Sequence, residues 1–274
     1  AGKGLAVIEI SIPFSNEEHV YRREHDHLES ASSQSRMFSG RAAHSSDPKG
    51  GDNAIMKMLE YLSQLPEGIA VLDLDGGIGY NTIPAKAVLE IDTVAGFKDP
   101  ILPKISRLYS SLRALEQELL NFREDGFSPA HPTINMGTIR TFENEVRITG
   151  SVRLPPSVTD VIYEGWMRGL ESAVGDVGAT FRVKDYRKGF STLPEAEFVT
   201  EAGRLLSGLG YEGMPVKSTS ASEASVFSRH GIDCLLFGPG MSVGNSHAPN
   251  ECVKISELRA ATDFYRKALE RFST

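Results

Sequence analysis

Twice along this chain, two alternating segments joined by a turn are followed by an amphipathic helix, and this repeated order constrains the fold most. The first hairpin lies within residues 69–94 and the second within residues 133–153. Alternation of apolar and polar side chains is typical of strands with one buried face. Apolar residues then recur at helical spacing over 105–122 and 158–174. This order predicts an α+β unit with its helices packed on its own sheet; a dimer seam is the alternative for the first helix.

The flanks of this unit have a different pattern. Residues 5–12 form a nearly continuous apolar run, which is how a buried parallel strand appears. From Pro194 onward helical segments alternate with short apolar runs, so strands are expected near Val216 and over 233–237.

We therefore predict an α/β protein in two parts. Residues 1–34 and 188–274 form one α/β/α layer, and residues 35–187 form an α+β domain inserted into it. The insertion starts with a strand over 37–44 and a helix after it, and a strand near 179–185 closes it.

Composition and charge narrow the classes of function. Twenty-nine basic and thirty-six acidic residues give a net charge of -7 without a basic stripe, so a nucleic-acid partner is not expected. The apolar runs are strand-sized and no leader is visible, so we expect no membrane span and a cytoplasmic location. Cys234 and Cys252 lack a disulfide-like spacing and are predicted to be free thiols.

The strongest functional signal is a histidine in the loop after the last apolar run. His247 lies in GPGMSVGNSHAPNECVKI, directly after the strand expected over 233–237. Loops at the ends of buried strands are where α/β proteins place their chemistry. A metal ligand is therefore predicted here, and a surface histidine in a turn is the alternative.

Three segments, in the same order, resemble the zinc amidohydrolase and exopeptidase family of acetylornithine deacetylase, succinyl-diaminopimelate desuccinylase, aminoacylase and glutamate carboxypeptidase. FSGRAAHSSDP, residues 38–48, is similar to the opening of the family's lid domain. GGIGYNTIP, residues 76–84, is similar to its glycine-pair hairpin, and the GPG to HAPNE segment to its C-terminal end. The resemblance implies a zinc-exopeptidase-like α/β/α catalytic layer with an inserted ferredoxin-like lid through which two copies form a homodimer.

The resemblance also implies a reaction and a cofactor. The reaction is hydrolysis of an amide bond in an N-acyl amino acid or small peptide by metal-activated water. One or two zinc ions, with cobalt as an alternative, would be bound by His247 and by Glu9, which takes the place of a carboxylate ligand at a strand end. A solvent-facing glutamate is the alternative for Glu9. Gly238 and Gly240 would offer backbone amides to the substrate.

Three lid residues are implied to act on the substrate. His44 resembles the lid histidine that stabilises the oxyanion of the tetrahedral intermediate. Asn81 matches the hairpin asparagine that grips the substrate carbonyl. The family's arginine falls near Val94 in this chain, and Arg153 is its expected replacement as the group that binds a substrate carboxylate. A surface arginine is the alternative for Arg153.

Several groups of the family have no counterpart here. Its His-x-Asp motif, bridging aspartate and general-base Glu-Glu pair precede the strand with which this chain begins. Glu17 and Glu18 are similar to this acidic pair, but they follow that strand instead of preceding it. We therefore expect Glu17 and Glu18 to lie in a solvated turn. We therefore expect a deacylase or exopeptidase that is inactive as this chain alone. The alternative is a catalytically silent fragment that mediates dimerisation.

Overall fold

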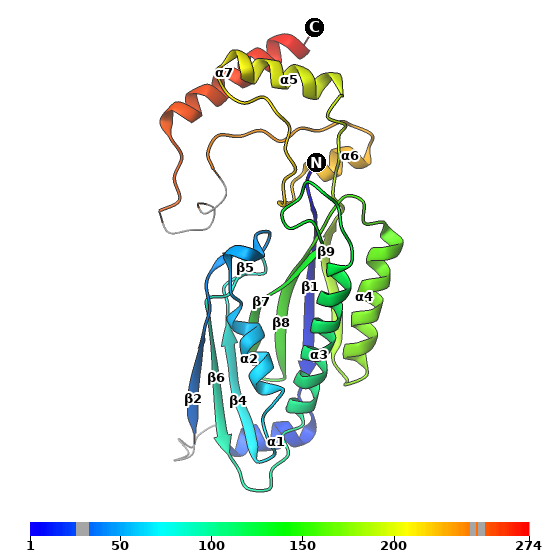
Figure 1. Cartoon of the computed structure of the whole chain (residues 1–274). Helices are drawn as coiled ribbons and strands as arrows, with labels where there is room; N and C mark the ends of the chain where they lie inside the picture. The colour runs from blue at the N-terminus through cyan, green and yellow to red at the C-terminus, as the bar shows by residue number, and fades with distance from the viewer. Residues whose placement is uncertain (26–32, 242–244, 246–249, 274) are drawn as a thin grey trace.

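The computed structural model describes residues 1–25, 33–241, 245 and 250–273. Its main body is an antiparallel sheet with the strand order β2-β6-β4-β7-β8-β1-β9 (Figure 1). The strands of this sheet are β1 Gly4–Pro13, β2 Gln34–Ser39, β4 Ile69–Gly76, β6 Lys86–Thr93, β7 Thr133–Thr141, β8 Glu145–Leu154 and β9 Thr180–Arg187.

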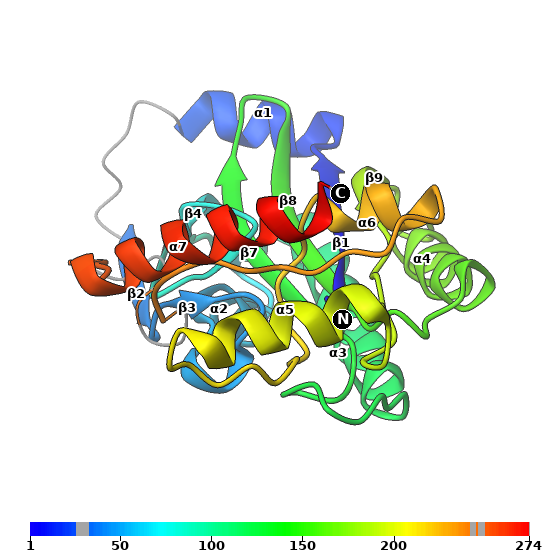
Figure 2. The same cartoon turned by 90° about the horizontal axis from the view of Figure 1, so that it is seen from above.

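Three helices cover one face of the sheet, and three more lie beyond its end (Figures 1 and 2). The first three are α2 Ala54–Leu62, α3 Ile101–Leu120 and α4 Asp160–Gly175. The C-terminal three are α5 Glu197–Gly208, α6 Ala224–Arg229 and α7 Ile255–Phe272. The remaining elements are α1 Asn16–His25, the short 3-10 helix η1 Pro48–Gly50, and a small sheet of β3 Ala43–His44 and β5 Thr82–Ile83.

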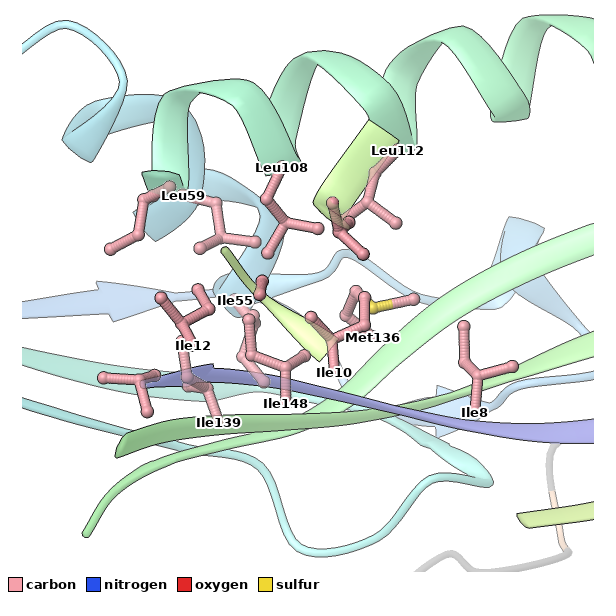
Figure 3. Close-up of a cluster of buried hydrophobic side chains, with 14 of the residues drawn as sticks. Ile8, Ile10, Ile12, Ile55, Leu59, Leu108, Leu112, Met136, Ile139 and Ile148 are labelled. Atoms are coloured by element: carbon pink, nitrogen blue, oxygen red, sulfur yellow. The ribbon is translucent and has the colours of Figure 1, made fainter. Parts of the chain in front are cut away.

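The core lies between the sheet and the helices α2, α3 and α4. Alternate residues of β1, Ile8, Ile10 and Ile12, face Leu108 and Leu112 of α3 (Figure 3). All five are buried, and burying each such side chain stabilises the fold by roughly 1.5–3 kcal/mol. The predicted packing of this helix on its own sheet is therefore confirmed, and so is the mixed α/β class.

The first strand was predicted with the wrong partners. β1 was expected in a parallel sheet with the C-terminal segments, but it pairs antiparallel with β8 along its whole length and with β9 on the other side. Residues 4–13 therefore belong to the sheet of residues 35–187, contrary to the predicted division at residue 34. The first half of β1 is buried on both faces of the sheet, which explains why its sequence is a nearly continuous apolar run although its neighbours are antiparallel.

Other expected elements differ locally. The strand predicted over 37–44 is split into β2 and β3, and no strand forms near Val216 or over 233–237. Near Val216 the pairing is limited to one parallel bridge between Gly2 and Ser218, which is too short to form a strand. Residues 233–237 have no such backbone partner among the described residues, and a strand requires a neighbouring ladder to pair its backbone groups. Glu18 lies in helix α1 rather than in a solvated turn, and its buried carboxylate pairs with Lys104 Nζ at 3.2 Å.

Among the described residues, no helix is both long enough and apolar enough to cross a membrane.

Candidate active site

The segment that carries His44 is held by the small sheet at one end of the large one (Figure 1). β3 pairs with β5, and His44 lies opposite Thr82. The backbone N–H of Ser45 donates to the carbonyl of Asn81 at 2.8 Å. Two segments that the sequence marked separately are thus joined by backbone hydrogen bonds.

Ser46 determines which nitrogen of the His44 imidazole carries the proton. The backbone N–H of Ser46 donates to Nδ1 of His44 at 3.2 Å, and Ser46 Oγ lies 2.6 Å from the same nitrogen. A backbone N–H can only donate, so Nδ1 accepts and the neutral ring carries its proton on Nε2. In this tautomer the N–H of His44 is on Nε2, and an N–H donor is the kind of group that oxyanion stabilisation requires.

Arg153 is a buried cation with unused donors. It lies on β8 between Leu5 of β1 and Thr133 of β7, and the residue is only 4% exposed. Its Nη2 donates to Ser45 Oγ at 3.2 Å, whereas its Nε has no hydrogen-bond partner among the described residues. Its environment is therefore not that of a surface arginine.

Among the described residues, no carboxylate balances the charge of Arg153. Burial lowers the pKa of Arg153 to about 10, and the nearby Tyr80 acts in the opposite direction. The guanidinium stays protonated at neutral pH, and no acidic side chain of the described residues contributes to this pKa. A buried charge without a partner is costly, so this position favours an anionic ligand that can accept two hydrogen bonds.

Lys3 is a second buried cation at this end of the sheet, and sequence reasoning missed it. Its Nζ donates to the carbonyls of Pro129 at 2.8 Å and His131 at 2.6 Å. Burial lowers the pKa of Lys3 to about 8, Glu124 opposes this shift and Arg153 adds to it. A single lysine between two glycines gave no signal, because its burial depends on residues more than a hundred positions away.

The loop that carries Asn81 rests on two further residues that the sequence did not single out. Asn135 of β7 and Ser151 of β8 donate side-chain hydrogen bonds to backbone carbonyls of this loop. Their only sequence signal is the presence of short polar side chains within two apolar strands. Asn81 and Arg153 therefore lie near one another, since the backbone carbonyl of Asn81 and the guanidinium of Arg153 both form hydrogen bonds with Ser45.

Glu9 lies elsewhere. It is in the middle of β1, not at its end, and faces Thr149 of β8 and Arg182 of β9. Its carboxylate lies 3.5 Å from the Nζ of Lys184, so it forms an ion pair on the sheet face away from the helices. This placement gives no support to a metal-binding role.

The C-terminal residues form a separate hollow. Gly238 and Gly240 line a cavity of about 500 Å³ between α5, α7 and residues 234–241, and neither His44 nor Arg153 lines it. His247 lies outside the described residues. Among the residues that the structure does describe, no three His, Cys, Asp or Glu side chains gather closely enough to hold a metal ion.

Comparisons with known proteins give the chain a family. A family model described as peptidase family M20/M25/M40 matches residues 18–271. Among solved structures, aminoacylhistidine dipeptidase from Vibrio alginolyticus is 17% identical with a TM-score of 0.61, covering 98% of this chain and 61% of that one. The dipeptidase Dug1p from Saccharomyces cerevisiae is 12% identical with a TM-score of 0.51, covering 99% and 55%. The chain thus spans less than two thirds of the length of either structure, and no curated protein matches it.

Proposed function

The chain belongs to peptidase family M20/M25/M40, and we propose that the protein hydrolyses an amide bond in a small substrate that carries a free carboxylate. An N-acyl amino acid and a dipeptide both meet this description. The observation that carries the proposal is the buried Arg153, which is hydrogen-bonded to the serine that follows His44 and whose Nε has no partner within the described part of the chain.

Each group has a distinct role in this proposal. The guanidinium of Arg153 binds the substrate carboxylate through two parallel hydrogen bonds. The Nε2–H of His44 donates to the carbonyl oxygen as negative charge develops on it, which is worth about 3–4 kcal/mol in comparable sites. Asn81, on the adjoining loop, binds the same substrate carbonyl in the ground state. Gly238 and Gly240 would add backbone amides only if the substrate also reached the C-terminal cavity.

Zinc is the proposed cofactor, as one or two ions, with cobalt as an alternative. Zinc bound in such an enzyme activates water and polarises the scissile carbonyl. His247 remains the proposed zinc ligand. Glu9 forms an ion pair with Lys184 instead, and the described residues do not by themselves form a metal site. We therefore propose that residues 1–274 alone are inactive. Cytoplasmic location stays a prediction from the sequence.

Two copies of the protein are proposed to associate through the edge strand β2. Met37 on this strand is 61% exposed. β9, at the opposite edge, carries Arg182, Lys184 and Arg187, and such charges disfavour edge pairing. Sedimentation of wild type and Met37→Lys tests this: a dimer that dissociates in the variant is expected, and a dimer that persists contradicts pairing through β2.

The substrate is tested on the protein at its natural length, loaded with zinc. Acetylornithine, succinyl-diaminopimelate and a set of dipeptides separate deacetylase, desuccinylase and dipeptidase activity. Each substrate is compared with its carboxamide, which lacks the charge that Arg153 is proposed to bind. Hydrolysis that is indifferent to this change, or no hydrolysis of any substrate, would contradict the proposal and favour a silent dimerisation module.

A further inference from the structure

Asn135 lies beneath the loop that carries Asn81 and is 7% exposed. Its Nδ2 donates to the carbonyl of Tyr80 at 3.2 Å and to the carbonyl of Thr82 at 3.1 Å, the two residues that flank Asn81. Its Oδ1 accepts a hydrogen bond from Asn53 Nδ2 at 2.9 Å. One buried amide thus holds the backbone on both sides of Asn81.

The orientation of the Asn135 amide follows from its neighbours. Asn53 is the N-cap of α2, where its Oδ1 accepts from the backbone N–H of Met56 at 3.0 Å. The Nδ2 of Asn53 then faces the Met136 carbonyl and Asn135, each at 2.9 Å. Since Asn53 donates, Asn135 presents its oxygen to Asn53 and both N–H groups to the loop.

The loop also approaches β7 too closely for side chains to intervene. Gly77 has a φ of +73°, and a Cβ atom there would lie 1.9 Å from the carbonyl oxygen of Gly137. A Cβ atom on Gly137 would lie 2.4 Å from the carbonyl oxygen of Gly79. The loop backbone therefore contacts the strand directly. Without the amide of Asn135, the Thr82 carbonyl would lose this donor, and the Tyr80 carbonyl would keep the Ser151 hydroxyl as its donor.

We propose that Asn135 is a positioning residue of the active site, which fixes the Asn81 loop and, through the Ser45 N–H, the segment that carries His44. Both of its N–H groups are donated within the protein, so it acts through Asn81 and does not bind substrate itself. The inference rests on the proposed function, because that function assigns Asn81 and His44 to the substrate.

Hydrogen exchange tests the anchoring without any substrate. Asn135→Asp has nearly the same shape and keeps an acceptor for Asn53, but it loses both donors. We expect the backbone amides of residues 77–83 to exchange at least ten-fold faster than in wild type, while those of β8 are unchanged. Asn135→Ala, which adds no charge, should give the same pattern. Asn144→Asp is the matched control, since it places the same change at the exposed turn of the same hairpin.

Two results would overturn the anchoring: unchanged exchange in residues 77–83, or equally faster exchange throughout β7 and β8. Kinetics of the natural-length protein test the consequence. Asn135→Ala should lower kcat/KM at least ten-fold relative to Asn144→Asp for any substrate that wild type hydrolyses. A loosened loop with unchanged kcat/KM would overturn the positioning role. If wild type hydrolyses nothing, the proposed function fails, and the exchange result still decides whether Asn135 anchors the loop.

Discussion

Arg153 donates a hydrogen bond from Nη2 to Ser45 Oγ at 3.2 Å, across 108 positions of the sequence. Ser45 directly follows His44 and also donates its N–H to the carbonyl of Asn81. One serine therefore joins a buried cation, an imidazole and an amide loop. A substrate bound there would be held by its carboxylate and its carbonyl at the same time, and this orientation is what a positioned reaction requires.

Substitution of Arg153 tests the carboxylate site. We expect Arg153→Met and Arg153→Lys to lower kcat/KM by roughly 100-fold, because neither side chain offers a planar pair of donors. The change should appear mainly in KM. Arg147→Lys is the control on the same strand, where the arginine is half-exposed and pairs with Glu145. Full activity of Arg153→Lys would show that charge alone suffices.

Substitution of His44 tests the oxyanion donor. We expect His44→Ala to lower kcat by about 100- to 1,000-fold with little change in KM, because the donor acts on the transition state. His230, an exposed histidine at the end of α6, provides the control His230→Ala. A His44→Ala variant with an unchanged kcat would remove His44 from the reaction.

The buried Lys3 predicts a pH-dependent stability. Its pKa is lowered from 10.5 to about 8 in the folded protein, so between these values the unfolded chain binds more protons. Stability from this group therefore increases as pH rises from 8 to 10.5. Lys3→Met should lower the free energy of unfolding by about 1–3 kcal/mol at pH 7, because two carbonyls lose their donor.

Urea unfolding of wild type and Lys3→Met, measured between pH 7 and 10.5, checks this expectation. The difference between the two proteins should widen with increasing pH. Parallel curves would show that Lys3 has an ordinary pKa in the folded state.

Metal content separates the two ligands that the sequence suggested. We expect Glu9→Gln to leave the bound zinc unchanged and to lower stability by less than about 1 kcal/mol, since its partner Lys184 is half-exposed. His247→Ala should reduce the bound zinc. The zinc content per mole of protein, measured for both variants, shows which residue binds the metal. Loss of zinc from Glu9→Gln would show that Glu9 is a metal ligand.

Local patterns predicted much of the sheet and its helices. The alternation over 133–153 corresponds to β7 and β8, and the stripe from Ile105 corresponds to α3. These features are visible in the sequence because buried side chains recur every two residues in a strand and every three to four residues in a helix. His44, Asn81 and Arg153 were suggested by short motifs that resemble a known family, and their roles in the reaction stay predictions.

Only the tertiary structure decided which strands are neighbours and which polar residues are buried. An apolar run such as β1 states that a strand is buried, but not that its partners are β8 and β9. The burial of Lys3 and the fully used amide of Asn135 likewise depend on backbone carbonyls far away in sequence. Hydrophobic periodicity is a local property of the chain, whereas hydrogen-bond partners and desolvation are set by segments that meet only after folding.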